Sequence, residues 1–228
     1  MGRLKFSMVM LLAEAFALSA GADSPYGYCS HIVGGPERDH LETAVGLIKG
    51  AGCGWIRDGL TWERLQKHPG DATWDFSVPD RAIAEMEKRG LKYLAILHCH
   101  RHGRPDFQKA SRDPGQWLGY VTKCVERYRG RVGAWEIWNE VNILAKIDNQ
   151  MSAAEYADFL RRTYRRIKEV DPTATVTTGG FSDLPIGYLR ELYRRGLKDF
   201  CDAISIHPYA WPPERSLDTR LEELKVLM

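Results

Sequence analysis

The sequence lacks a strong excess of charge and lacks the cysteine patterns of small stapled or zinc-binding folds. Its 228 residues carry a formal net charge of +2, whereas a nucleic-acid-binding domain needs a clustered basic face. The arginines at positions 161–166 recur at helical spacing and predict a solvated helix face. Five irregularly spaced cysteines form neither a disulfide framework nor a CxxC pair. We therefore expect no nucleic-acid partner, disulfide scaffold or structural zinc.

Long apolar runs are missing except at the N-terminus. Phe6 to Ala20 is mostly apolar, follows Arg3 and Lys5, and leads into the small-residue cleavage signal Ala20-Gly21-Ala22. Glu14 interrupts this run, which argues against a membrane anchor. We predict a signal peptide over residues 1–22, a secreted or periplasmic location, and no membrane partner.

Glycine-rich phosphate-binding loops are also missing. Neither GxGxxG nor a P-loop follows the first predicted strand, so the sequence gives no support for a dinucleotide or phosphate cofactor. We expect no cofactor. Hydrophobic residues make up 44% of the chain, which is enough for a sizeable core. Residues 23–228 are predicted to form one domain.

Strand-like and helix-like segments alternate six times, with short links and no hairpin signals, and this pattern predicts parallel βα units. The predicted strands are Tyr26–Val33, Cys53–Asp58, Lys92–His98, the run from Val132 to Trp138, Thr175–Thr178 and Ala203–His207. The predicted helices are Asp39–Lys49, Pro79–Arg89, Gln116–Arg129, Ser152–Val170, Tyr188–Arg195 and a last one from Leu217 onward.

Polar residues at several strand ends separate two possible α/β architectures. His31, Arg57, His98, Glu140 and His207 each lie at or just after the carboxyl end of a different predicted strand. An open doubly wound sheet uses mainly one crevice. A (β/α)8 TIM barrel instead gathers its site from many strand ends. We therefore predict a barrel with about six of its eight βα units in this chain.

Glu140 is the strongest candidate for acid–base chemistry. It ends the apolar, aromatic stretch Trp135-Glu136-Ile137-Trp138-Asn139-Glu140. A carboxyl buried beside indoles is expected to have a raised pKa, which a general acid requires. The alternative is a structural carboxylate paired with an arginine. Glu136 lies deeper on the same strand, and we expect it to support the site, with Arg57 as its candidate partner.

This stretch resembles the acid/base motif of clan A glycoside hydrolases, with family 39-like and family 5-like (cellulase-like) members the most similar. The neighbouring sequence resembles the same clan at Trp55-Ile56-Arg57 with Trp62, at Arg129-Gly130-Arg131-Val132, at Ser152 to Tyr156, at Lys168 to Pro172 and at Asp202 to Tyr209. The resemblance extends from about Tyr26 to Trp211.

The resemblance implies retaining hydrolysis of a β-linked O-glycosidic bond in a polysaccharide or oligosaccharide. Glu140 would protonate the leaving oxygen and then activate water, and Asn139 would bind the sugar 2-hydroxyl. A glutamate ending the seventh strand would be the nucleophile. The glutamates that follow the sixth strand here are Glu214, Glu222 and Glu223, and none ends an apolar strand. We therefore expect a C-terminally truncated chain whose nucleophile lies beyond Met228.

Histidine, tyrosine and tryptophan side chains complete the predicted substrate site. His207 and Tyr209 are two residues apart, so both can point to one face of an extended strand. His98 is expected to contact sugar, with His31 a weaker candidate. His98, His100 and His102 also alternate, which raises a metal-dependent hydrolase as a further alternative, but we expect no metal. Trp62 and Trp211, in predicted loops, are candidate sugar platforms. For indoles nearer the motif, core packing is favoured for Trp135, and packing and platform roles are balanced for Trp138.

Two classes of function fit these features. The first is a secreted retaining glycoside hydrolase that uses Glu140. The second is a non-catalytic carbohydrate-binding pseudo-enzyme on the same barrel, which would bind sugar through Trp62 and Trp211 without turnover. The sequence names neither the sugar nor the oligomeric state.

Overall fold

A computed structural model describes residues 24–33, 35, 39–99, 104–143, 151–209 and 213–228. The predicted signal peptide lies outside these residues, as do His100, His102 and Trp211. No helix in the described ranges is long and apolar enough to cross a membrane.

The described strands form one parallel, six-stranded sheet in the order β1-β2-β3-β4-β5-β6, so each strand pairs with its neighbour in sequence. The strands are β1 (Gly27–Cys29), β2 (Trp55–Gly59), β3 (Lys92–Leu97), β4 (Ala134–Asn139), β5 (Val176–Ser182) and β6 (Ile206–His207). The predicted parallel βα architecture is therefore confirmed.

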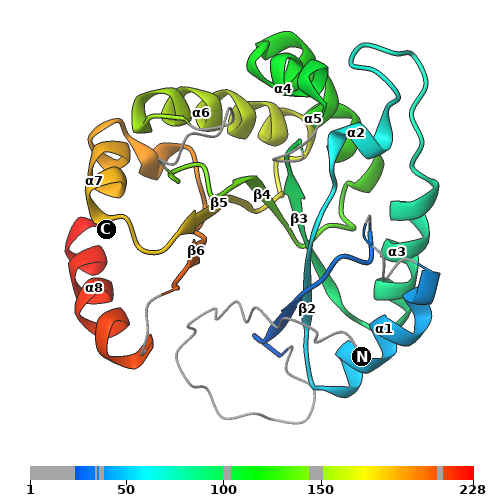
Figure 1. Ribbon diagram of the computed structural model, residues 1–228, viewed down its shortest axis with the longest axis horizontal. Helices are drawn as coiled ribbons and strands as arrows, with labels where there is room; N and C mark the ends of the chain where they lie inside the picture. The colour runs from blue at the N-terminus through cyan, green and yellow to red at the C-terminus, as the bar shows by residue number, and fades with distance from the viewer. Residues whose placement is uncertain (1–23, 34, 36–38, 100–103, 144–150, 210–212) are drawn as a thin grey trace.

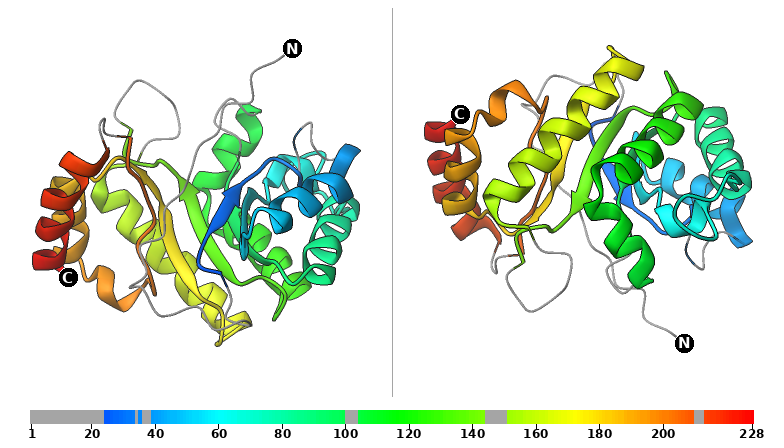
Figure 2. Two further views of the ribbon diagram at one scale, coloured as in Figure 1. Left: turned by 90° about the horizontal axis from the view of Figure 1, so that it is seen from below. Right: turned by 90° about the horizontal axis from the view of Figure 1, so that it is seen from above.

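Helices connect the strands and cover the convex side of the sheet, while the strands follow an arc (Figure 1). The helices are α1 (Leu41–Gly50), α2 (Trp62–Leu65), α3 (Ser77–Lys88), α4 (Pro105–Arg112), α5 (Pro114–Tyr128), α6 (Ala153–Val170), α7 (Ile186–Arg194) and α8 (Pro213–Leu227), with a 3₁₀ turn at Leu197–Asp199. Figure 2 shows α7 and α8 side by side beyond β6.

Helix α6 illustrates how local sequence sets these elements. The Ser152 side chain accepts from the Glu155 backbone, and the Glu155 carboxylate accepts from the Ser152 backbone, which forms a complete capping box at its start. The side chains that α6 buries recur at helical spacing, at Tyr156, Phe159, Leu160, Thr163 and Ile167. This apolar stripe places α6 against β4 and β5, behind the strand ends that carry the candidate site.

Three expectations about local structure are wrong. Residues Trp62–Leu65 and Pro105–Arg112 form helices where loops were expected. Strand β5 continues through Gly179 and Gly180 instead of ending there. A Cβ on Gly179 would lie 2.4 Å from the Ile137 carbonyl oxygen. These glycines are therefore sites of close packing within the sheet and do not mark a turn.

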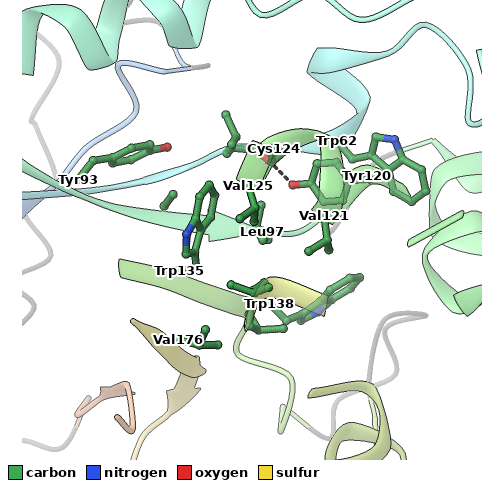
Figure 3. Packing of buried hydrophobic residues seen from close by; sticks show 14 of the residues in the cluster. Trp62, Tyr93, Leu97, Tyr120, Val121, Cys124, Val125, Trp135, Trp138 and Val176 are labelled. Carbon is green, nitrogen blue, oxygen red and sulfur yellow. Dashed lines mark hydrogen bonds between the residues drawn. The ribbon is translucent and has the colours of Figure 1, made fainter. Parts of the chain in front are cut away.

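Trp62 belongs to the core and is not the open sugar platform expected from sequence. Its side chain is 1% exposed and stacks on Tyr120 with ring centroids 5.0 Å apart, and Figure 3 shows the two side chains together. The indole nitrogen donates to Gln66 Oε1 at 2.7 Å. The short helix α2 folds the indole inward, so both its face and its polar atom are satisfied inside the protein. Trp135 is also buried, as expected.

The Asp58 carboxylate fixes the chain that follows β1. Its Oδ2 accepts hydrogen bonds from Ser30 Oγ at 2.8 Å and from the Val33 backbone at 3.1 Å, and its Oδ1 accepts from the Gly59 backbone at 2.6 Å. Asp58 is buried, and burial raises its pKa from 3.8 to about 6 although these hydrogen bonds oppose the change. Folding therefore favours the neutral form of Asp58 relative to the unfolded chain, and the carboxyl loses its proton in the folded protein at about pH 6.

This raised pKa predicts a stability change with pH. Because the folded-state pKa lies above the unfolded value, the contribution of Asp58 is fully present below about pH 4 and is lost as the pH rises through about 6. Relative to Asp58→Asn, the wild-type free energy of unfolding should fall over this window by on the order of 2 kcal/mol. Urea denaturation of both proteins at several pH values measures this difference in the free energy of unfolding. The exposed control Asp158→Asn should show no such fall, and a pH-independent difference for Asp58→Asn would contradict the prediction.

Candidate active site

An ion pair crosses the concave side of the sheet. Arg57 on β2 donates from Nε to Glu136 Oε2 at 3.0 Å and from Nη2 to Glu136 Oε1 at 2.6 Å. Strand β3 separates β2 from β4 in the sheet. The two side chains meet because the sheet curves and both point inward. The pair expected between Glu136 and Arg57 is therefore present.

The guanidinium of Arg57 also organises neighbouring groups. Its Nη2 donates to Asn139 Oδ1 at 2.8 Å, and its Nη1 lies 3.3 Å from Cys29 Sγ at the end of β1. Burial opposes the charged form, but the Glu136 carboxylate outweighs burial and raises the pKa of Arg57 above its ordinary value. Arg57 thus stays charged and fixes which way the Asn139 carboxamide faces.

Both carboxylate oxygens of Glu136 accept hydrogen bonds inside the protein. Its side chain is 0% exposed, and Oε1 also accepts from the Gly180 backbone at 3.0 Å. Oε2 also accepts from Ser205 Oγ, just before β6, at 3.2 Å. This carboxylate therefore links β2, β4, β5 and the start of β6, and it has no path to solvent through which it could reach a substrate.

The backbone of β4 is distorted where the candidate site begins. Trp138 and Glu140 have φ values of 75° and 51°, and Asp183 at the end of β5 has 59°. These three are the non-glycine residues with positive φ in the described part of the chain. Such conformations cost on the order of 1–3 kcal/mol each and persist only where the surroundings hold them.

Tyr156 of α6 supports this distortion from behind. Its buried hydroxyl donates to the Ile137 carbonyl at 2.9 Å and accepts from the Gly179 backbone at 2.6 Å. The hydroxyl therefore bridges β4 and β5 next to Trp138, which is absent from the register of paired residues. Both backbone groups remain bonded although the residue pairing of the two strands is interrupted at Trp138.

The distortion presents Glu140 to residues of β6. Oε1 of Glu140 lies 2.9 Å from His207 Nδ1 and accepts a hydrogen bond from the Tyr209 hydroxyl. The Glu140 side chain is 14% exposed, and the Tyr209 residue is 62% exposed. Burial of the phenol end, together with the Glu140 carboxylate, raises the pKa of Tyr209 above its ordinary value. Glu140 is thus held by His207 and Tyr209 and remains partly accessible to solvent. The raised pKa expected for it stays a prediction.

The His207 ring lies on Gly180. A Cβ at Gly180 would lie only 2.1 Å from His207 Nε2, so only glycine leaves room for the ring. Nε2 is buried and has no hydrogen-bond partner among the described residues. The Nδ1 proton can therefore be donated to an ionised Glu140, with Nε2 left as the unprotonated nitrogen. Two donors on Oε1 suit the carboxylate form, which is the form a general base needs.

The remaining predicted site residues have other surroundings or lie outside the described residues. His98 follows β3, with Nδ1 3.0 Å from the Cys99 carbonyl and Nε2 3.4 Å from Thr61 Oγ1. His31 is exposed two residues after β1. Trp138 is buried and packs edge-on against Phe159, so core packing is its role. Trp211, His100 and His102 lie outside the described residues. Within the described ranges no group of three metal-binding side chains is present.

Sequence reasoning missed Tyr156 and Asn142. The sequence predicts a helix over Ser152–Val170 and gives Tyr156 no role in the site. Asn142 follows Glu140 by two residues, and its side chain bonds to the backbone of Ser182. An asparagine three residues after a strand end was the available signal, because its carboxamide can replace backbone hydrogen bonds.

The fold matches solved glycoside hydrolases, although no protein-family model and no curated protein matches the chain. A family 39 glycoside hydrolase from Bacteroides cellulosilyticus WH2 has 27% identity over 82% of this chain and 38% of its own, with a TM-score of 0.65. The xylanase Xyn10A from Cellvibrio japonicus, a thermostable mutant, has 14% identity over 91% and 67%, with a TM-score of 0.70. The exo-β-1,4-mannosidase Op5Man5 from Opitutaceae bacterium strain TAV5 has 19% identity over 68% and 31%, with a TM-score of 0.56.

These matches confirm the resemblance to clan A glycoside hydrolases and the fold class. The six strands and their helices correspond to part of a (β/α)8 barrel. The chain spans 38% of the length of the family 39 structure, so it matches well under half of that protein.

The buried pair between Arg57 and Glu136 yields a stability prediction. Glu136→Gln leaves the guanidinium buried beside a neutral amide, and the free energy of unfolding should fall by about 3–5 kcal/mol. Glu87→Gln is the matched control. Arg131 binds Glu87 with the same two-point geometry, at 2.8 and 2.7 Å, but at the surface. Its loss should cost about 1 kcal/mol or less.

A double-mutant cycle tests whether burial of an unpaired charge is the cause. Arg57→Met combined with Glu136→Gln removes the charge and its partner together, so the double variant should lose less stability than the sum of the two single variants. Urea denaturation of the four proteins measures the coupling. Additive losses would show that the pair is not the source of the effect.

Proposed function

We propose that the protein performs retaining hydrolysis of a β-linked O-glycosidic bond in a polysaccharide or oligosaccharide, with Glu140 as general acid/base. The observation that carries this proposal is the placement of Glu140. It follows a strand end of a partial barrel, is partly open, and is bound at one oxygen by His207 and Tyr209. Active sites of (β/α)8 barrels lie at this face.

The proposed roles of the neighbouring residues follow from their bonds. Arg57 fixes Asn139 through its oxygen, which leaves the amide protons of Asn139 available to a sugar hydroxyl. Hydrogen bonds to the sugar 2-hydroxyl strengthen in the oxocarbenium-like transition state. His207 and Tyr209 would stabilise Glu140 as a carboxylate after it has protonated the leaving group. His98, His31 and Trp211 remain proposed substrate contacts.

A second carboxylate is needed as the nucleophile, roughly 5 Å from the first. Glu136 is unsuited to this role because it is fully buried and both of its oxygens accept hydrogen bonds. We propose that the nucleophile is a glutamate ending a further strand, encoded within about 60 residues after Met228, since a βα unit takes roughly 30 residues. An open reading frame with no such strand would sink the hydrolase proposal.

The binding-only alternative is less well supported. It relied on Trp62 and Trp211 as sugar platforms, and Trp62 is 1% exposed within the core. The metal-dependent alternative relied on His98, His100 and His102, of which only His98 lies in the described residues. Export to a secreted or periplasmic location is also proposed, because of the apolar segment before Ala22.

The catalytic proposal predicts a dependence on the leaving group. In the complete gene product, Glu140→Gln should lower kcat/KM for unactivated β-glycosides by about 10²–10⁴-fold, the usual value of general acid catalysis. Aryl glycosides with very acidic phenols need little protonation, so their bond cleavage should be affected less. The exposed carboxylate control Glu223→Gln should behave as wild type. Sugar binding without turnover by wild type would instead support the pseudo-enzyme.

Residues 1–228 produced alone should hydrolyse β-glycosides at most marginally, because covalent catalysis needs the nucleophile that we place beyond this sequence. The measurement is release of a chromogenic phenol, compared with that from the complete gene product. Turnover by the 1–228 protein that disappears in Glu140→Gln would show that the second carboxylate lies within these residues.

A further inference from the structure

The Asn142 side chain pairs with the backbone of Ser182 through two hydrogen bonds. Nδ2 donates to the Ser182 carbonyl at 2.9 Å, and Oδ1 accepts from the Ser182 amide at 2.9 Å. A side-chain amide has the same donor and acceptor as a peptide group. Asn142 therefore continues the pairing between β4 and β5 beyond Asn139, where β4 ends.

This pair closes a ring of contacts around Glu140. Ser182 is in register with His207 across β5 and β6, and the Asp183 amide donates to the His207 carbonyl at 2.8 Å. His207 Nδ1 in turn lies 2.9 Å from Glu140 Oε1. Glu140 contacts His207, His207 is paired with Ser182, and Ser182 is bonded to Asn142, which follows Glu140 by two residues in the chain. The position of the Glu140 carboxyl relative to His207 is therefore fixed twice, by the contact between the two side chains and by the bonds that hold Asn142 to Ser182.

The backbone on both sides of this pair is in an unfavourable conformation. Glu140 and Asp183 have φ values of 51° and 59°. The Glu140 amide donates to the Gly180 carbonyl at 2.9 Å. A residue with a Cβ keeps a left-handed conformation only where its neighbours prevent relaxation. The two hydrogen bonds of Asn142 supply that restraint at the point where the chain leaves the sheet.

We propose that Asn142 is a positioning residue for Glu140: its carboxamide pairs with the Ser182 backbone and so holds the Glu140 carboxyl against His207. The effect on turnover rests on the proposed hydrolase function, whereas the effect on the position of Glu140 does not. Asn142 itself would contact neither the sugar nor the bond that breaks.

Asn142→Asp gives the sharpest test, because the introduced carboxyl has nearly the same shape. When ionised, it still accepts from the Ser182 amide but has no proton for the Ser182 carbonyl. When neutral, it has both groups and can restore the pair. The neutral form is therefore favoured in the folded protein, and the pair should be present at low pH and lost as the pH rises. Asn142→Ala lacks the pair at every pH.

Ser182→Ala is the matched control. Both bonds from Asn142 go to the backbone of Ser182, so removing the hydroxyl leaves them in place. Other groups nearby also carry or gain charge: Glu140 just after β4, Asp183 just after β5, His207 on β6, Tyr209 just after it, and Arg220 of α8, which binds Asp183. Each variant is therefore compared with wild type at the same pH.

The first readout is the backbone amide signals of Ser182 and Glu140 in ¹H–¹⁵N spectra, which do not require turnover. Both signals should shift in Asn142→Ala at all pH values. In Asn142→Asp they should match wild type at low pH and approach those of Asn142→Ala as the pH rises. In Ser182→Ala the Glu140 signal should stay in place. An unchanged Glu140 signal in Asn142→Ala would overturn the proposal, as would an Asn142→Asp variant that resembles Asn142→Ala at every pH.

The second readout is turnover by the complete gene product. Asn142→Ala should lower kcat by about 10-fold or more with KM changed by less than about twofold, since small displacements of a catalytic group cost rate. The ratio of Asn142→Asp to wild-type kcat should fall as the pH rises. Wild-type kcat in Asn142→Ala would overturn the proposal. If wild type shows no turnover but the amide signals behave as expected, the positioning proposal stands and the hydrolase proposal fails.

Discussion

The ion pair between Arg57 and Glu136 is the interaction on which the concave face depends. A charged guanidinium inside a sheet is tolerated only beside an anion, and the anion here is itself surrounded by donors from β5 and the start of β6. The pair therefore sets the distance between strands that are not neighbours. It also fixes Asn139, and through Asn139 the start of the segment that carries Glu140.

Next to this ion pair, side chains replace some of the regular hydrogen bonds of the sheet. Tyr156 bridges Ile137 and Gly179, Glu136 takes up the Gly180 amide, and Asn142 pairs with Ser182. Each replacement occurs where β4 departs from ideal geometry. In the distorted segment the Glu140 carboxyl lies against His207. The hydrogen bonds of Tyr156, Glu136 and Asn142 together hold the backbone in its unfavourable conformation.

The fold was predictable because strands and helices alternate with short links, and the six strands appear where the sequence indicated them. Arg57, Glu140 and His207 were expected together because parallel strands present their ends at one edge. Asn139 was expected from the resemblance to clan A, and Tyr209 from its spacing to His207. Trp62 was misassigned because the length of a loop does not reveal a short helix that turns an indole inward. The roles of Tyr156 and Asn142 depend on the left-handed backbone at Trp138 and Glu140, and local sequence carries little signal of it.

Gly180 is the position that leaves room for the ring of His207. The imidazole of His207 fills the space that a larger side chain at position 180 would need, so Gly180 cannot be replaced while His207 keeps this position. A descendant with alanine at this position would have to relocate the ring, and its carboxyl would lose one of its partners. A genome search could therefore use this glycine, together with the histidine, as a compact filter for relatives that have kept the same arrangement.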